Sequence, residues 1–256
     1  MDIAKTFATL RIADHALNVP LSFPDPVVFP SSHTVFTRDN DGDTLLHTAV
    51  LLGMSKVAYR FTCGHENRQS LDIQNYLGET VLHISVLTGQ MRMTKLLIAC
   101  GACGKKQDER GDTPLHIACR LGDLDAVCAL TKPLLCAKEL PCMYRVPFAK
   151  LTDSAQITKS CLHVAMNGGY VDILRYLTVS RDVDINLPHA LTGYTVLHMC
   201  CDNPGVEMFD FLVRERRETK VDFSPLSYSG QTPQDIAHGN GHLIVEKCIQ
   251  MAAQKY

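Results

Sequence analysis

Thr113-Pro114-Leu115-His116-Ile117-Ala118 decides the fold of this chain, because this six-residue pattern recurs with substitutions at five other places. The other copies begin at Thr44, Thr80, Ser160, Thr195 and Thr232. Five copies keep the histidine, as His47, His83, His116, His163 and His198, and the sixth has Asp235 instead. The steps between these positions are 36, 33, 47, 35 and 37 residues. A pattern that recurs at this period predicts a protein built from stacked helical modules.

Residues at fixed distances from the pattern recur as well. Two residues before the Thr position there is a glycine, where a tight turn needs a positive φ, at Gly42, Gly78, Gly111, Gly193 and Gly230. A second glycine follows the histidine position by six residues, at Gly53, Gly89, Gly122, Gly169 and Gly241. Fourteen residues after the histidine position the side chain is large and apolar, as Phe61, Leu97, Leu130, Leu177, Leu212 and Ile249. One module cannot bury this column alone, so neighbouring modules must stack.

A period near 33 residues around Thr-Pro-Leu-His is typical of ankyrin repeats. We therefore predict an all-α ankyrin-repeat solenoid of about six helix-loop-helix units with β-hairpin-like turns. The predicted repeat domain is 39–256, with units at about 39–75, 76–108, 109–132, 157–190, 191–225 and 226–256. The stretch 133–156 holds three prolines and predicts a long loop. Residues 1–38 hold four prolines and predict a flexible N-terminal arm.

Composition narrows the class of function. The chain has 25 basic and 27 acidic residues, so its net charge of −2 provides no overall field for nucleic acid or for an acidic membrane. Its eleven cysteines are odd in number, and no basic-then-apolar leader precedes them, which predicts a reducing, intracellular compartment. No run approaches the roughly 18 apolar residues of a membrane-spanning helix.

The histidines and cysteines could also suggest a metal or catalytic site. In this register each histidine is better interpreted as a structural group that bonds the turn to the start of the helix. Cys100 and Cys103 form a CxxC pair, but no second ligand pair lies at a matching distance. The sequence also has no phosphate loop and no nucleophile elbow. We therefore predict no catalytic residue, no metal and no cofactor, and a protein that acts by binding another protein.

The tips of the turns are the candidate binding residues, because packing does not constrain their sequence. The first tip carries Asp39, Asp41 and Asp43, and the third carries Asp108, Glu109 and Asp112. Such tips would attract a basic peptide, and the attraction would weaken as salt rises. The alternative is an ordinary solvated turn, in which aspartate is favoured because it bonds the backbone.

Several phrases go beyond a generic repeat and resemble the IκB family of NF-κB/Rel inhibitors, most closely its insect member Cactus. They are Asp41 to Thr44, Leu71 to Asn75, Val86 to Gln90, Arg110 to Cys119 and Ala129 to Thr131, with Cys161 to His163, Gly169-Tyr170 and Asn203-Pro204 further on. The family also lengthens the connection between the third and fourth repeats. The resemblance covers about residues 39 to 252.

The resemblance implies a function. IκB proteins hold Rel dimers in the cytoplasm by masking the basic nuclear-localisation segment with their first repeats and packing later repeats on the dimerisation domains. Asp41 and Asp43 fall where the family presents acids to that basic segment. We therefore expect a cytoplasmic inhibitor of Toll/NF-κB immune signalling that binds a Rel dimer, does not contact nucleic acid or membrane directly, and is a monomer when free.

Two departures from the family modify this expectation. Residues 1–38 have no Asp-Ser-Gly phosphorylation motif and one lysine, Lys5, and no acidic tail follows the sixth unit. We hypothesise an inhibitor that resists signal-induced degradation, which would suit either a viral or parasite mimic or a cellular IκB. The other functions left open are a nuclear IκB-like transcriptional co-regulator, an ankyrin adaptor for a ubiquitin ligase and, least favoured, a zinc or thiol enzyme.

Overall fold

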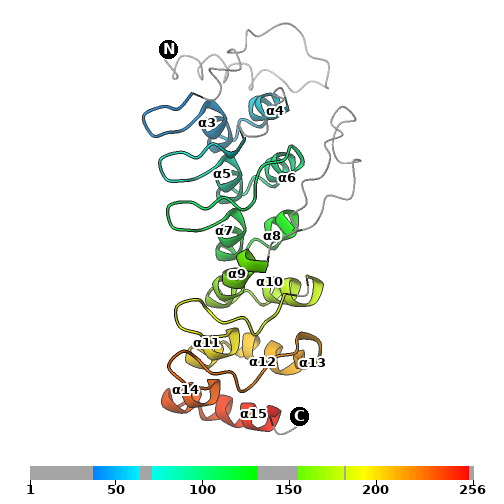
Figure 1. Ribbon diagram of the computed structural model, residues 1–256. Coiled ribbons are helices and arrows are strands. Elements are labelled where there is room, and N and C mark those ends of the chain that lie inside the picture. The colour runs from blue at the N-terminus through cyan, green and yellow to red at the C-terminus, as the bar shows by residue number, and fades with distance from the viewer. Residues whose placement is uncertain (1–36, 64–70, 132–154, 182, 254–256) are drawn as a thin grey trace, which may run out of the picture. The chain divides into compact units, whose positions relative to one another are not determined.

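The computed structural model describes residues 37–63, 71–131, 155–181 and 183–253, and within these ranges every regular element is a helix (Figure 1). The first helices of the six repeats are α3 (Leu45–Leu51), α5 (Val81–Leu87), α7 (Pro114–Leu121), α9 (Ala155–Asn167), α11 (Val196–Asp202) and α14 (Pro233–Gly239). Their second helices are α4 (Ser55–Cys63), α6 (Met91–Ala99), α8 (Leu124–Thr131), α10 (Val171–Arg175) with η2 (Tyr176–Ser180), α12 (Val206–Arg214) with α13 (Arg216–Thr219), and α15 (Leu243–Ala253). The predicted arm 1–38 and long loop 133–156 lie almost wholly outside the described residues.

The chain divides into two compact bodies. The N-terminal body has residues up to Ile117 and the segment 128–151, and the C-terminal body has 118–127 and the residues from Thr152 onward. Helices α3 to α6 therefore belong to the first body and α9 to α15 to the second. Within each body, first helices pack on first helices, as α3 does on α5 and α11 on α14.

In every repeat except the fourth, the first helix begins at a capping threonine that bonds the side chain three residues later. In the first repeat, Nδ1 of His47 accepts the Thr44 N–H at 3.2 Å and lies 2.7 Å from the Thr44 hydroxyl. The equivalent pairs are Thr80 with His83, Thr113 with His116, and Thr195 with His198. In the sixth repeat the carboxylate of Asp235 accepts the Thr232 N–H in the same way. These bonds satisfy donors that the start of a helix leaves unpaired.

In four of the histidines, Nε2 reaches the backbone of the next repeat. Nε2 of His47 is 3.2 Å from the Glu79 carbonyl oxygen, and Nε2 of His83 is 3.2 Å from that of Asp112. In the C-terminal body the same contact joins His163 to Tyr194 at 2.8 Å and His198 to Gln231 at 3.1 Å. A carbonyl only accepts, so Nε2 must carry the proton while Nδ1 accepts from threonine. The neutral Nε2–H ring is therefore a structural link between two repeats.

The predicted apolar column is buried throughout the two bodies. Phe61, Leu97, Leu130, Leu177, Leu212 and Ile249 are at most 5% exposed. Burying a leucine of this size stabilises the fold by about 1.5 to 3 kcal/mol relative to leaving it in water. The stacking of modules that the sequence predicted is thus present, with this column at its centre.

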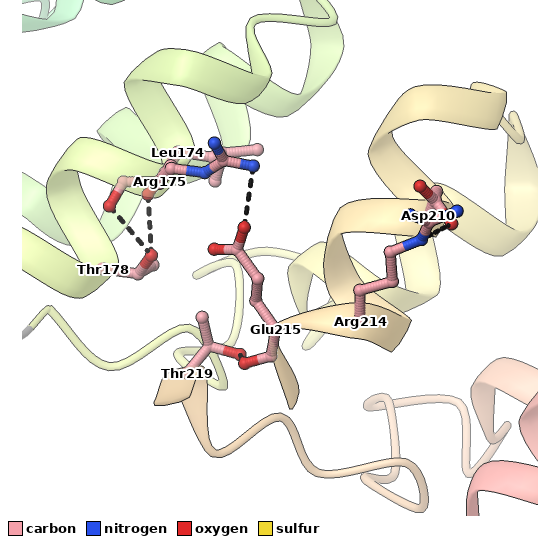
Figure 2. A network of polar contacts seen from close by, with 7 residues as sticks. All are labelled: Leu174, Arg175, Thr178, Asp210, Arg214, Glu215 and Thr219. Atoms are coloured by element: carbon pink, nitrogen blue, oxygen red, sulfur yellow. Dashed lines mark hydrogen bonds and ion pairs between the residues drawn. The ribbon is translucent and has the colours of Figure 1, made fainter. Parts of the chain in front are cut away.

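The fourth repeat departs from the others at both of its helices. Helix α9 begins at Ala155, two residues before the predicted start of that repeat at 157. It includes Thr158, which stands where five repeats have a turn-forming glycine. The second helix changes from an α-helix to a π-turn at Tyr176. Figure 2 shows this region: the Thr178 hydroxyl donates to the Leu174 carbonyl at 2.8 Å, and Arg175 forms a 2.7 Å ion pair with Glu215 at the end of α12.

Candidate protein-binding surface

Three short loops in the N-terminal body, which we call acidic fingers, precede α3, α5 and α7. They are residues 39–43, 75–79 and 108–112, and they lie side by side in Figure 1. In each finger the first residue donates its N–H to the carbonyl of the fifth at 2.9 Å, as Asp39 does to Asp43. The fourth residue is a glycine with positive φ, for example 80° in Gly42. The fingers are therefore closed hairpin-like turns of identical length.

Neighbouring acidic fingers are bonded to each other. The Tyr76 N–H donates to the Asp41 carbonyl at 3.1 Å, and the Glu109 N–H donates to the Leu77 carbonyl at 3.0 Å. The Tyr76 ring lies across Gly42, where an added Cβ would come within 2.8 Å of its Cδ1 atom. These contacts hold the fingers in one arrangement before any partner binds, which reduces the entropy lost on binding.

Two of the six predicted acids close their own finger. One carboxylate oxygen of Asp39 accepts the N–H groups of Asp41 and Asp43 at 3.0 and 2.8 Å. Asp108 accepts those of Arg110 and Asp112 at 2.9 and 2.8 Å. The ordinary interpretation of an aspartate in a turn thus describes part of what these two side chains do.

The remaining predicted acids differ in how much of their carboxylate is available. Asp43 accepts the Asn75 amide at 2.9 Å and is half-buried, and Asp112 is half-buried and has its backbone carbonyl on His83. Asp41 and Glu109 are exposed, and within the described residues neither carboxylate has a hydrogen bond or ion pair. These two are the best placed to meet a partner, and their binding role stays a prediction.

Sequence reasoning missed a seventh acid, Glu79, and two exposed large side chains, Tyr76 and Leu77, on the same surface. Glu79 takes the fifth position of the middle finger, where the other two have Asp43 and Asp112. The repeat register itself could have found it. Tyr76 and Leu77 are 60% and 59% exposed in the same finger. Together the three fingers carry seven carboxylates and one guanidinium, that of Arg110.

The buried cysteines and possible metal-binding clusters are the other candidates for a catalytic or metal site. Burial raises the pKa of the Cys200 and Cys201 thiols to about 12, so both stay protonated and are poor nucleophiles. Among the described residues no group of three or more His, Cys, Asp or Glu could hold a metal ion, and that includes the surroundings of Cys100 and Cys103. No helix in the described ranges is long and apolar enough to span a membrane.

A shallow hollow of about 580 Å³ lies in the C-terminal body between α10 and α12. Its two arginines are already used: Arg175 pairs with Glu215 and lies over the Phe211 ring, and Arg214 pairs with Asp210 at 2.6 Å (Figure 2). The hollow contains no serine, cysteine, histidine or lysine. Its lining therefore offers carboxylates and one tyrosine, but neither a serine or cysteine nucleophile nor a histidine or lysine base.

Comparison with protein families identifies the class of protein. Residues 46–139 match the family model for ankyrin repeats in three copies, and residues 159–190 match the model for a single ankyrin repeat. A solved ankyrin repeat domain of Bcl-3, described as a unique member of the IκB protein family, superposes with a TM-score of 0.65 at 26% identity, covering 83% of this chain and 87% of that one. The chain is an ankyrin-repeat protein, as its sequence predicted.

Three curated relatives show to which ankyrin-repeat proteins the chain is related. It is 29% identical to chicken NF-kappa-B inhibitor alpha over 82% of this chain and 63% of that protein. It is 30% identical to the Drosophila yakuba NF-kappa-B inhibitor cactus over 79% of this chain and 44% of that protein. It is 27% identical to the mouse B-cell lymphoma 3 protein homolog over 93% of this chain and 52% of that protein. The chain is therefore homologous to the IκB proteins, and it spans between about two fifths and two thirds of the length of these relatives. This kinship with protein-binding repeat proteins confirms the prediction that it is not an enzyme.

Proposed function

We propose that this protein binds NF-κB/Rel transcription factor dimers, holds them in the cytoplasm and so suppresses Toll/NF-κB signalling. One observation carries the proposal: a chain homologous to NF-κB inhibitors presents a preformed row of acidic fingers in its N-terminal body. Its partner would be a basic, extended segment such as a nuclear-localisation sequence.

The fingers suit a basic segment for electrostatic and geometric reasons. Seven carboxylates on three bonded fingers raise the local concentration of a cationic chain and speed its encounter. Asp41 and Glu109 then supply carboxylates that can accept charge-assisted hydrogen bonds, and Tyr76 offers an aromatic face to a cationic side chain. Covering the basic segment in this way would keep it from any other receptor.

Neutralising the two exposed finger carboxylates tests the proposal. We expect Asp41→Asn combined with Glu109→Gln to weaken binding of a purified Rel dimer by about 1.5 to 3 kcal/mol for each charge-assisted hydrogen bond removed. Titration calorimetry at low and at high salt measures this. The difference in affinity should shrink as salt rises, because exposed charges are screened.

The matched control is Asp172→Asn, which removes an exposed carboxylate from α10, a helix of the C-terminal body that is not part of any acidic finger. Its affinity for the Rel dimer should equal that of the unmodified protein. If the unmodified protein has no affinity for Rel dimers, the proposed function is wrong. If it binds but the finger variant binds equally well, the partner stands and the acidic fingers are not its site.

Resistance to signal-induced degradation stays a prediction that cells can test. The sequence contains no Asp-Ser-Gly tripeptide. We expect the level of the protein to stay constant after Toll stimulation, while a co-expressed IκB that carries the tripeptide disappears. Immunoblots over the first hour after stimulation measure both. Disappearance of both proteins together would contradict the prediction.

A second candidate function is a nuclear co-regulator that binds Rel proteins without retaining them in the cytoplasm. The alignment with the mouse B-cell lymphoma 3 protein homolog favours it, because it covers 93% of this chain, more than the alignments with the two inhibitors. Cell fractionation separates the two functions. The inhibitor should accumulate with Rel in the cytoplasm, whereas the co-regulator should accumulate with Rel in the nucleus.

A further inference from the structure

The second helices of the first two repeats carry charge of one sign. Lys56 and Arg60 of α4 and Arg92 and Lys95 of α6 are exposed, and neither helix contains an aspartate or a glutamate. We call these four residues the basic helix face. Figure 1 shows α4 and α6 on the side of α3 and α5 that faces away from the acidic fingers. The N-terminal body therefore has an acidic surface on one side and a basic surface on the other.

The cations of the basic helix face form a regular array. Lys56 and Arg92 hold the same place in their repeats, nine residues after His47 and His83. Helix α4 packs on α6, and packed helices lie about 8 to 10 Å apart. Arg60 follows Lys56 by four residues, which places the two about 6 Å apart along one side of α4. The array thus has one row of cations on each repeat.

The acidic fingers are spaced in the same way, because every repeat contributes one finger and one second helix. The fingers are bonded to each other in a row, and Asp41 and Glu109 are exposed there. The Tyr76 ring of the middle finger is also largely exposed. The finger row of one molecule therefore matches the helix rows of another in both charge and repeat spacing.

We propose that the basic helix face binds the acidic fingers of a second copy of this chain. Lysine and arginine would donate charge-assisted hydrogen bonds to the finger carboxylates, and Tyr76 offers its ring to a guanidinium such as that of Arg92. The contact joins two different surfaces, so copies add head to tail instead of closing a symmetric dimer.

This contact has a consequence for the acidic fingers themselves. For concentrated protein at low salt it replaces the free monomer that the family resemblance implies. A finger row that is covered by another copy is closed to the basic segment of a Rel protein, so the two compete. The self-association requires no Rel protein, and it can hold even if the proposed function is wrong.

A second copy fits the basic helix face better than a nucleic acid does. A duplex carries its charge continuously along its length, so it would extend past two helices and be repelled by the carboxylates of the same body. Single strands are bound by aromatic side chains on which bases stack, and residues 91–107, which include α6, contain no aromatic residue. The fingers are instead an acidic partner whose spacing the chain itself fixes.

Sedimentation equilibrium of the full chain without any partner tests the inference. Exposed ion pairs are individually weak and are screened by salt. We therefore expect the average mass to rise with protein concentration, up to about 1 mM at low salt, and to return to that of the monomer at high salt. An oligolysine peptide should dissociate the assemblies, because it occupies the fingers.

Charge reversal on each surface identifies the contact. Lys56→Glu with Arg92→Glu should weaken self-association at least about tenfold, and so should Asp41→Lys with Glu109→Lys. In each variant the two surfaces have the same sign and repel. An equimolar mixture of the two variants should associate again, because the acidic helices of one then face the basic fingers of the other. Recovery in the mixture also shows that both variants are folded.

The matched control is Lys220→Glu with Lys247→Glu, two exposed lysines of the C-terminal body whose reversal changes the net charge equally. It should self-associate within about threefold of the unmodified protein. The inference is overturned if the unmodified protein stays monomeric at low salt, if the control and the basic-face variant lose affinity equally, or if mixing restores nothing. A monomer that binds oligoglutamate or duplex DNA through the basic helix face would have a different occupant there, which also overturns it. Rel binding is measured separately and decides only the proposed function.

Discussion

Gly78→Ala should destabilise the N-terminal body more than the equivalent glycine-to-alanine change in the next acidic finger. Gly78 has φ of 73°, which costs an alanine roughly 1 to 2 kcal/mol. The new Cβ would also come within 2.7 Å of the Glu109 nitrogen and 2.9 Å of the Asp108 carbonyl carbon, both backbone atoms of the next finger. Forcing atoms apart in packed structure costs a further 1 to 3 kcal/mol or so. Guanidinium unfolding measures the sum.

Gly111→Ala is the matched control for this experiment. Gly111 holds the same position in the third finger with φ of 80°, but an added Cβ meets nothing within 4 Å. Gly111→Ala should therefore lower the free energy of unfolding only by the cost of holding an alanine at positive φ, about 1 to 2 kcal/mol. Equal destabilisation by the two changes would mean that the packing of one finger on the next contributes nothing to stability.

The repeat architecture could be predicted from the sequence because it depends on residues with few substitutes. A turn with positive φ needs glycine, and a seam shared by two modules needs a large apolar side chain every period, as at Leu97 and Leu212. These constraints act locally, and the glycine recurs five times and the apolar side chain six times. The buried column and the stacked helical pairs could therefore be predicted before any coordinates were known.

The irregular features could not be predicted, because they arise from single exceptions. Thr158 stands in place of the turn glycine of five other repeats, but nothing in the sequence indicates that α9 begins at Ala155. Nothing in the pattern around Tyr176 indicates a π-turn. The bond from the His189 N–H to the Tyr194 carbonyl encloses six residues, one more than the closing bond of an acidic finger. This extra residue changes the spacing of one repeat by too little to stand out among steps of 33 to 37 residues.

The candidate site could be predicted in part. Charge showed that the first and third tips are acidic, but a sequence does not show which carboxylates close their own turns. Asp39 and Asp108 do so, whereas Asp41 and Glu109 keep theirs exposed. Glu79 was missed because it is the one acid of its finger and so forms no run with its neighbours. Tyr76 and Leu77 were missed because the exposure of a large side chain is a tertiary property.

The histidine links predict how stability depends on pH. Burial holds the pKa of His47, His83 and His198 below the ordinary value of 6.5 in the folded chain. Protonation would also end the acceptance of the threonine N–H by Nδ1. A histidine with a lowered pKa binds fewer protons folded than unfolded, so unfolding takes up protons. Stability should be full above pH 6.5, fall as pH drops below 6.5, and stop falling below the lowered pKa.

Denaturant unfolding at a series of pH values measures this slope, and one variant assigns it. His83→Gln should unfold with a shallower dependence on pH below 6.5, because a glutamine at this position can still bond the Thr80 N–H as the third residue of a capping box but does not titrate. The His83→Gln variant should also have a lower free energy of unfolding at about pH 8. The imidazole ring reaches both Thr80 and the Asp112 carbonyl, and the glutamine amide is not shaped to reach both. A variant with the same slope as the unmodified protein would show that buried His83 does not contribute to the acid sensitivity, and that other groups take up the protons.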